Sequence, residues 1–121
     1  MEERLIEADF GDWEMKQWKA VHSGDVDGWF RKVVNTPSPG GESMWDLHDR
    51  VLSLLSEIAE AGNMGFNYVF VTHAGVIRSA ASHVLGLSLD LAVNMIFDYG
   101  SLTLIEHDGS KFKLRYLNCT K

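Results

Sequence analysis

The sequence is poor in cysteine and proline, and it has no long apolar run. Its single cysteine, Cys119, excludes an intramolecular disulfide and is typical of a protein from a reducing compartment. No apolar stretch approaches the roughly 20 residues that a membrane-spanning helix needs, and the first four residues, MEER, are not typical of a signal peptide. We therefore expect a cytoplasmic protein that does not contact a membrane.

Positive charge is also scarce, because 11 lysines and arginines face 17 aspartates and glutamates, a net charge of −6. A face that binds nucleic acid needs clustered positive charge, so we expect no nucleic-acid partner. The histidines are scattered, and no cysteine or carboxylate joins a pair of them at the spacing of zinc ligands. We expect no metal and no cofactor. We interpret four histidines as surface or packing residues: His22, His48, His83 and His107.

Several motifs of common enzymes are missing. The chain has no G-x-S-x-G nucleophile elbow, no Walker A loop, no dinucleotide-binding glycine pattern and no C-x-x-C pair. Three tryptophans, Trp13, Trp18 and Trp29, lie close together in the sequence. In so acidic a chain, we expect them to pack against one another over short helices rather than to stack on nucleic-acid bases.

The length and the apolar content fit a single globular domain, and the order of the expected elements, helices, strand, helices and hairpin, predicts an α/β layered domain. Both prolines fall in residues 35–41, which we interpret as a loop and not as a domain boundary. Apolar residues spaced by three and four predict a long helix over residues 44–58, and Asp108-Gly109 predicts a hairpin turn. The other expected elements are an extended segment at 4–6, short helices in 13–32 broken at Ser23-Gly24, a buried strand at 67–72, helices at 76–85 and 88–95, and strands at 101–106 and 111–117.

The most informative stretch is V-T-H-A-G-V-I-R, residues 71–78. It places His73 between a predicted strand and a predicted helix. Ligands in open α/β sheets bind at the carboxyl ends of strands, and the free N–H groups at the start of a helix favour an anion. The small Ala74 and Gly75 let a ligand approach the backbone. His73 is therefore a candidate to bind a phosphate or to carry a proton; the alternative is a half-buried structural histidine.

Three other places allow both a functional and a structural interpretation. Glu7 follows two apolar residues, and a carboxyl group that apolar surroundings keep protonated can act as a general acid. Taken alone, Glu7 is better explained as a solvated loop carboxylate. Arg78 is either a site residue or an ordinary helix arginine. Glu42 and Ser43 in the P-G-G-E-S stretch favour a helix cap, although that loop could also line a pocket.

These stretches, in this order, resemble the histidine phosphatase superfamily in its phosphoglycerate-mutase-like branch. Residues 5–14 are similar to its L-x-E-x-x-F-G-x-W-E segment, and residues 39–43 with Arg50 to its P-G-G-E-S loop and helix. Residues 71–78 are similar to its second-histidine motif, and residues 99–103 to one of its antiparallel strands. The W-E-x-x-x-W run together with P-G-G-E-S is most similar to α-ribazole-5′-phosphate phosphatases, enzymes of cobalamin nucleotide-loop assembly.

The resemblance implies a role for each candidate residue. His73 binds the phosphoryl group, and Glu7 donates a proton to the leaving alcohol. Ala74 and Gly75 lie beside the substrate, and Arg78 supports the site without touching phosphate. The implied substrate is a small-molecule phosphate ester, with no metal or cofactor. The implied fold is the three-layer phosphoglycerate-mutase-like α/β fold with a mixed sheet.

The chain departs from the family in one large respect. It contains no R-H-G motif, whose histidine is the family's nucleophile and whose arginine binds phosphate, and it lacks the second phosphate arginine. Residues 1–121 therefore resemble the carboxyl-terminal portion of the domain. The expected sheet is incomplete because it lacks its first, central strand. That strand would lie between residues 67–72 and 101–106.

Such a gap leaves apolar strand residues without partners, among them Val69, Val71, Leu102 and Leu104. We expect two chains to pair through these exposed edges as a homodimer; the alternative is that the two strands close on each other. We expect a phosphohistidine-type phosphomonoester hydrolase whose activity is absent or very weak in this chain. The alternatives are another small-molecule or sugar-phosphate phosphatase of the same branch, and a noncatalytic anion-binding or interaction module.

Overall fold

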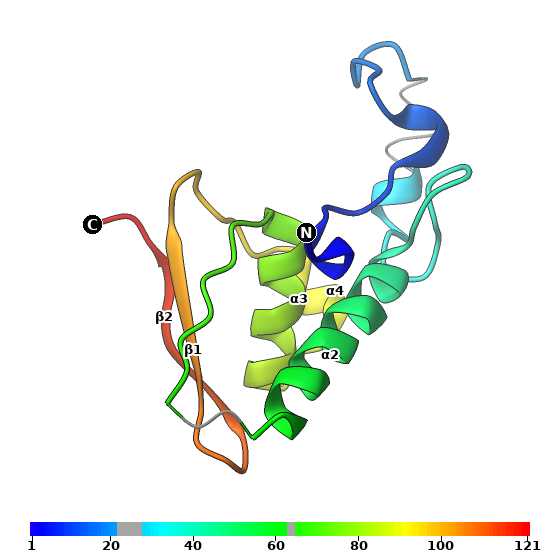
Figure 1. Cartoon of the computed structure of the whole chain (residues 1–121). Coiled ribbons are helices and arrows are strands. Elements are labelled where there is room, and N and C mark those ends of the chain that lie inside the picture. The colour runs from blue at the N-terminus through cyan, green and yellow to red at the C-terminus, as the bar shows by residue number, and fades with distance from the viewer. Residues whose placement is uncertain (22–27, 63–64) are drawn as a thin grey trace.

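The computed structural model describes residues 1–21, 28–62 and 65–121 (Figure 1). Two 3₁₀ turns, Glu3–Leu5 and Gly11–Trp13, come first. They are followed by helices α2 (Met44–Glu60), α3 (Ala74–Leu85) and α4 (Leu89–Ala92) and by strands β1 (Leu102–His107) and β2 (Phe112–Cys119). In Figure 1, α3 stands between α2 and the β1–β2 hairpin. The fold is α/β, as predicted, with the described helices on one side of the hairpin.

Helix α2 begins at the predicted cap. The Ser43 hydroxyl accepts a hydrogen bond from the N–H of Asp46 at 3.2 Å, and the Asp46 carboxylate accepts one from the N–H of Ser43 at 2.8 Å. This reciprocal capping box gives hydrogen-bond acceptors to two backbone N–H groups. One of them, in the first turn, has no acceptor within the helix. The hydrogen bonds from Ser43 also lower the pKa of Asp46. The cap therefore carries negative charge at the positive end of the helix.

The core lies between α2 and α3. Leu47 and Val51 of α2 are 0% and 2% exposed, and they pack in one cluster with Val76 of α3. Gly86, with a φ of 65°, ends α3 in the left-handed conformation at the predicted place. None of the helices in the described residues combines the length and the apolar character that crossing a membrane requires. The buried residues that complete the cluster are Val34, Met44 and Leu89.

The predicted hairpin is confirmed. Strands β1 and β2 run antiparallel, with Ile105 opposite Leu114. The carboxylate of Asp108 accepts hydrogen bonds from the N–H groups of Ser110 and Lys111, each at 3.0 Å, which closes the turn. The inner side of the hairpin is covered by α3, which contacts β2.

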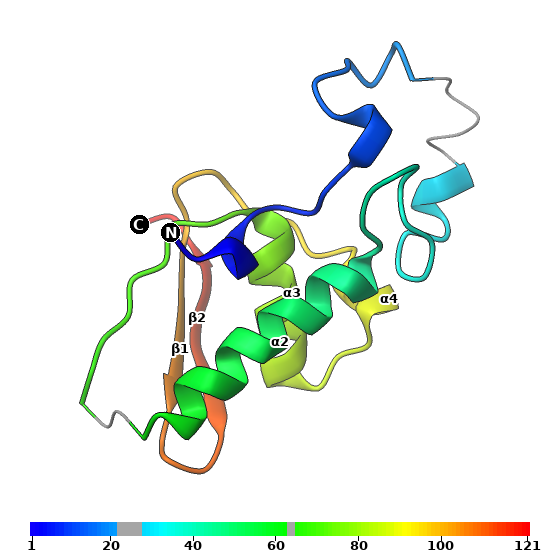
Figure 2. The same ribbon diagram turned by 45° about the vertical axis from the view of Figure 1, so that its right-hand side comes forward.

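The prediction of a strand at residues 67–72 is wrong for this structure. These residues are extended but belong to no strand, and the sheet in the described residues consists of β1 and β2. Figure 2 shows this segment running apart from the hairpin, so the two have not closed on each other. An extended segment becomes a strand only when a neighbour accepts its backbone hydrogen bonds. The sheet is thus incomplete where the sequence predicts a missing strand, and the predicted mixed sheet is reduced to an antiparallel pair.

Two smaller expectations concern the first part of the chain. The extended segment predicted at residues 4–6 is wrong, because Glu3–Leu5 is a 3₁₀ turn. The carboxylate of Glu2 accepts the N–H of Arg4 at 3.0 Å, and such a local bond favours a turn over extended backbone. His22 and the helix break predicted at Ser23-Gly24 lie outside the described residues.

The aromatic cluster is confirmed. The ring centroid of Trp13 lies 6.4 Å from that of Trp18 and 5.3 Å from that of Trp29, with the rings steeply inclined to each other. Phe10 also packs edge-to-face on Trp18 and Trp29. The Trp29 indole N–H donates to the carbonyl of Thr36 at 2.7 Å, so its polar atom is satisfied. These contacts hold together the part of the chain before α2.

His48 is buried between the two long helices. Its Nδ1 lies 2.8 Å from the Ser79 hydroxyl, and the residue is 8% exposed. This agrees with its interpretation as a packing residue. Burial lowers the pKa of His48, with a smaller contribution from His83. The folded state therefore favours the neutral imidazole.

We predict that this histidine makes the fold sensitive to mild acid. Below the unfolded-state pKa of about 6.5 the unfolded chain gains a proton that the folded chain resists, so stability falls as pH decreases from there toward the lower folded pKa. The urea midpoint should drop between neutral pH and about pH 5.5, and His48→Gln should reduce that drop. The same substitution at exposed His73 is the control, and an equal reduction there would contradict the assignment to His48.

Candidate functional site

A cavity of about 310 Å³ opens where the chain enters α3. Glu7, His73 and Ala74 line it, together with Thr72 and Ile77. Its opposite wall is the loop at residues 97–101, which leads into β1. The structure therefore brings together three of the four candidate residues, although Glu7 is far from the other two in the sequence.

Glu7 is held at the first turn of α3. Its Oε2 accepts the N–H of Gly75 at 3.2 Å, and its Oε1 accepts the N–H of Ala8 at 3.0 Å. A carboxylate in this position interacts favourably with the helix dipole. Glu7 is thus not a freely solvated loop carboxylate, which was the interpretation its local sequence favoured.

Gly75 is what allows Glu7 to come so close. A Cβ at this position would collide with the Glu7 carboxylate and would lie 2.9 Å from Cδ2 of Leu47. Gly75 itself is buried and lies behind the residues that line the cavity. In this structure Gly75 leaves space for the Glu7 carboxylate. Direct contact between Gly75 and a substrate stays a prediction.

Arg50 of α2 fixes the backbone that carries Glu7. Its guanidinium donates to the carbonyl oxygens of Arg4 at 2.9 Å, Ile6 at 2.8 Å and Glu7 at 3.0 Å. The same group makes a two-pronged ion pair with Glu42, with N–O distances of 2.8 and 2.9 Å. The hydrogen bond from Arg50 lowers the pKa of Glu42. Bidentate pairs of this kind hold their geometry well, so α2 determines where Glu7 lies.

The P-G-G-E-S loop supports the turn that follows Glu7. Oε2 of Glu42 accepts the N–H of Asp9 at 2.9 Å, and the carbonyl of Asp9 accepts the N–H of Glu42 at 2.7 Å. Gly11, with a φ of 53°, lies so close to the carbonyl of Pro39 that a Cβ would collide with it. These contacts fit the structural interpretation of the loop, which does not line the cavity.

His73 is the N-cap residue of α3, and its side chain makes no capping bond. The residue is exposed, and its ring has no hydrogen-bond partner in the part of the chain that the structure describes. The N–H groups of Ala74 and Val76 also lack an acceptor among the described residues. An accessible imidazole beside free helix amides is an arrangement that can bind an anion.

The opposite wall of the cavity was not predicted from the sequence. Asp98 is fixed by Asn118: its N–H donates to Oδ1 at 2.8 Å, and Nδ2 of Asn118 donates to its carboxylate at 2.9 Å. The charged groups lining the cavity are thus Glu7 and Asp98, with the titratable His73, and no described lysine or arginine lines it. Phosphate binding relies on positive charge, so the site lacks a main requirement for it.

Arg78 does not supply that charge. Its Nη2 donates to the carbonyl of Met95 at 2.8 Å, and its guanidinium lies 5.9 Å from the centre of the Phe97 ring. Burial lowers the pKa of Arg78. Arg78 therefore supports the loop before Asp98 and does not line the cavity.

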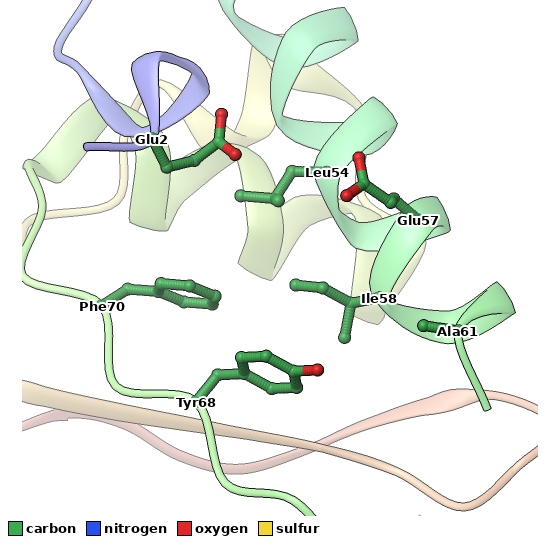
Figure 3. Close-up of a pocket in the computed structure, with 7 residues that line it drawn as sticks. All are labelled: Glu2, Leu54, Glu57, Ile58, Ala61, Tyr68 and Phe70. Carbon is green, nitrogen blue, oxygen red and sulfur yellow. The ribbon is translucent and has the colours of Figure 1, made fainter. Parts of the chain in front are cut away.

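A second cavity, of about 300 Å³, lies between the second half of α2 and residues 66–73. Figure 3 shows the rings of Tyr68 and Phe70 directed toward Ile58, with the carboxylates of Glu2 and Glu57 on the other side. Both carboxylates pair with Arg4 at 2.8 Å. Apart from these paired carboxylates and the Tyr68 hydroxyl, the lining is apolar. The first cavity, which has a carboxylate and an imidazole beside free amides, is therefore the better candidate site. The described residues contain no cluster of His, Cys, Asp or Glu that could hold a metal ion.

Comparisons with known proteins agree on one family. The model of the "Histidine phosphatase superfamily (branch 1)" matches residues 1–120. The "Putative phosphoserine phosphatase 2" of Hydrogenobacter thermophilus is 30% identical over 98% of this chain and 59% of its own length. The "Probable phosphoglycerate mutase GpmB" of Salmonella paratyphi B is 35% identical over 69% of this chain and 40% of its own length. The chain therefore spans about 59% or less of these relatives.

Solved structures share the fold. Bacillus stearothermophilus YhfR matches with a TM-score of 0.83 and 28% identity over 98% of this chain and 60% of its own. The α-ribazole phosphatase of Shigella flexneri matches with a TM-score of 0.80 and 22% identity, over 98% of this chain and 59% of its own. The fold of residues 1–121 is thus also found in proteins that contain more chain.

Proposed function

Because the chain belongs to the histidine phosphatase superfamily, we propose that it is part of a phosphomonoester hydrolase that works through a phosphohistidine. One observation carries the proposal. Glu7 is held at the start of α3 by the amide of Gly75, and it lines the same cavity as His73. This position brings a carboxyl group next to the proposed phosphate site, where in its protonated form it can give a proton to the leaving oxygen.

In the proposed reaction the phosphoryl group moves from the ester oxygen to a histidine nitrogen and then to water. His73 and the nearby amides of α3 bind the phosphoryl oxygens. Glu7 gives its proton to the alkoxide as the first P–O bond breaks, and it then takes a proton from the attacking water. By the resemblance, the nucleophilic histidine and one phosphate arginine belong to an R-H-G motif, and a second phosphate arginine follows that motif; this sequence contains neither the motif nor the second arginine. We therefore propose that residues 1–121 alone have little or no activity.

The proposed substrate is α-ribazole 5′-phosphate, in cytoplasmic cobalamin nucleotide-loop assembly. The W-E-x-x-x-W and P-G-G-E-S stretches support it, and the fold is shared with α-ribazole phosphatases. The test uses a completed chain, in which an R-H-G-bearing segment precedes residues 1–121. A higher kcat/KM for α-ribazole 5′-phosphate than for sugar phosphates supports the proposal. The reverse order favours the sugar-phosphate alternative, and the relatives named for phosphoserine and phosphoglycerate make those esters useful comparisons.

In the completed chain, Glu7→Gln is expected to slow hydrolysis of an alkyl phosphate about 10²-fold or more, and that of p-nitrophenyl phosphate much less. The alkoxide is a poor leaving group that needs a proton, whereas nitrophenolate leaves without one. Steady-state kcat for both esters decides the matter. Equal losses for the two would show that Glu7 only positions or binds the substrate.

A noncatalytic anion-binding module is the second candidate, favoured by the free N–H groups of Ala74 and Val76 at the start of α3. For either function we predict that inorganic phosphate binds residues 1–121 weakly, with a Kd in the range of about 1 mM or above. Titration followed by NMR should shift the His73 ring and the amides of Ala74 and Val76. His73→Ala should remove the amide shifts, while His107→Ala should leave them. No shift at saturating phosphate would contradict an anion site.

A further inference from the structure

The loop that forms the opposite wall of the first cavity is fixed by its neighbours on both sides. Arg78 of α3 donates to the carbonyl of Met95 from Nε at 3.3 Å and from Nη2 at 2.8 Å, and its guanidinium lies 5.9 Å from the centre of the Phe97 ring. Further along the loop, the N–H of Ser101 donates to the carbonyl of Asp98 at 3.2 Å, which closes a turn. This fixed loop places Asp98 in the lining of the cavity.

Asn118 of β2 holds both the backbone and the side chain of Asp98. Oδ1 of Asn118 accepts the N–H of Asp98 at 2.8 Å, and Nδ2 of Asn118 donates to Oδ2 of Asp98 at 2.9 Å. Oδ1 of Asp98 accepts no hydrogen bond in the part of the chain that the structure describes. One oxygen of the carboxylate is therefore fixed, and the other is available to a ligand in the cavity.

The backbone of β2 is irregular at Asn118. The register of the hairpin shifts between Leu102 and Leu104, as at a β-bulge, and Asn118 is among the β2 residues opposite this shift. Asn118 has a φ of 53°, in the left-handed region that asparagine tolerates better than most residues, and its N–H donates to Oγ1 of Thr103 at 3.3 Å. A bulge redirects a side chain, and in this protein the redirected side chain is the one that holds Asp98.

The two walls of the cavity differ in what they attract. At the start of α3, the free N–H groups of Ala74 and Val76 favour the phosphoryl group. On the opposite wall, the carboxylate of Asp98 can accept a hydrogen bond from a hydroxyl group and repels another carboxylate. Glu7 adds a second carboxyl group to the same cavity. A leaving group with its own carboxylate would therefore meet like charge there, whereas a hydroxyl group would find an acceptor.

We propose that Asp98 is a specificity-determining residue, which makes the site prefer phosphate esters of hydroxyl-bearing alcohols that carry no carboxylate, and that Asn118 is the residue that positions it. This inference rests on the proposed function, because it concerns which esters that phosphatase hydrolyses. It is separate from the roles of His73 and Glu7. Those two residues act on the phosphoryl group and the leaving oxygen, which every phosphate ester has, whereas Asp98 acts on the rest of the alcohol.

A matched pair of esters tests the role of Asp98 in the completed chain. Glycerol 3-phosphate and 3-phosphoglycerate differ in the leaving alcohol, which ends in a CH₂OH group in the first and in a carboxylate in the second. The kcat/KM should be higher for glycerol 3-phosphate. Asp98→Asn should reduce the ratio of the two values about tenfold, mainly by raising kcat/KM for 3-phosphoglycerate. Asp90→Asn is the matched control, because it removes the same charge from an exposed position on α4 outside the cavity lining, and it should leave the ratio unchanged.

Asn118→Gly tests the positioning residue. Glycine keeps the left-handed backbone but removes both side-chain bonds to Asp98, so the ratio should fall at least about threefold. In a chain that already carries Asp98→Asn, the same change should alter the ratio less than about twofold, because the charge that Asn118 positions is gone. A merely structural role for Asn118 would instead lower kcat/KM equally for both esters, with or without Asp98→Asn.

Three results would overturn the inference while the proposed function stands. They are a completed chain that prefers 3-phosphoglycerate, a ratio that Asp98→Asn leaves unchanged, and an equal loss of kcat/KM for both esters in Asp98→Asn. Failure of the proposed function looks different. A completed chain that hydrolyses neither these esters nor p-nitrophenyl phosphate would contradict that function, and the inference would fall with it.

Discussion

Joining an R-H-G-bearing strand segment to the start of residues 1–121 is expected to raise the rate of p-nitrophenyl phosphate hydrolysis at least about 10⁴-fold. The added histidine supplies the nucleophile that splits one difficult displacement into two steps. The added arginine supplies positive charge to a cavity whose charged groups are otherwise Glu7 and Asp98. Steady-state kcat/KM of both proteins, prepared in parallel, measures the difference.

Two controls separate this gain from contamination or a general effect on folding. Replacing the added histidine by alanine should return the rate to that of residues 1–121, and His73→Ala in the completed chain should lower it strongly. The prediction fails in one informative way. If residues 1–121 alone show a steady rate that His73→Ala abolishes, His73 itself is a nucleophile and the division of roles given above is wrong.

Arg50→Met is expected to reduce the free energy of unfolding by about 2–4 kcal/mol. The substitution leaves the Glu42 carboxylate without its cation and removes the donor to three carbonyl oxygens. The side chains of the pair are only 20% and 23% exposed, so water replaces these bonds poorly. Urea unfolding at neutral pH measures the loss. The loss should shrink as pH falls from the unfolded-state pKa of glutamate, about 4.3, toward the lower folded pKa of Glu42, because protonation of Glu42 then ends the ion pair in the unsubstituted protein.

Arg4→Met is the matched comparison. Arg4 makes two ion pairs at 2.8 Å, with Glu2 and Glu57, but the Glu57 side chain is 67% exposed. Ion pairs at the surface are screened by water, so this change should cost much less than Arg50→Met. Equal losses for Arg4→Met and Arg50→Met would show that the bonds from Arg50 to the backbone add nothing. Arg50→Met should also shift the Gly75 amide resonance, because the position of Glu7 depends on it.

The elements that could be predicted from the sequence are those whose partners lie nearby in the chain. The apolar stripe of α2, its Ser43 cap, the Gly86 end of α3 and the Asp108 turn are local signals, and each was confirmed. The strand at residues 67–72 has the composition of a buried strand, yet what makes a strand is a paired neighbour. Composition alone could not show that none is present among the described residues. The 3₁₀ turn at Glu3–Leu5 was not predicted, because it is favoured by a single local hydrogen bond, from the N–H of Arg4 to the carboxylate of Glu2.

Of the candidate site, only the side that carries His73 could be predicted from the sequence. The residues next to His73 in the sequence were enough to identify it as a candidate. Glu7, by contrast, is interpreted as a solvated carboxylate from its local sequence, and only the structure shows its contact with Gly75. The wall formed by residues 97–101 carried no signal for a site, because residues 99–103 resemble a strand of the family and predict only that strand. The part played by Arg50 was also invisible, because its acceptors are backbone oxygens, and these exist at every position of every sequence.

The bonds that Arg50 makes have a consequence for how a phosphatase of this kind is put together. Three groups within the described residues hold Glu7 and the backbone that follows it: the guanidinium on α2, the amide on α3 and the turn at residues 9–12. If Glu7 is the acid, as proposed above, proton transfer and covalent attack are assembled by different stretches of polypeptide. In the proposed enzyme the carboxyl group can then be ordered without the nucleophile. We expect changes to the nucleophile's segment to leave the geometry of Glu7 intact.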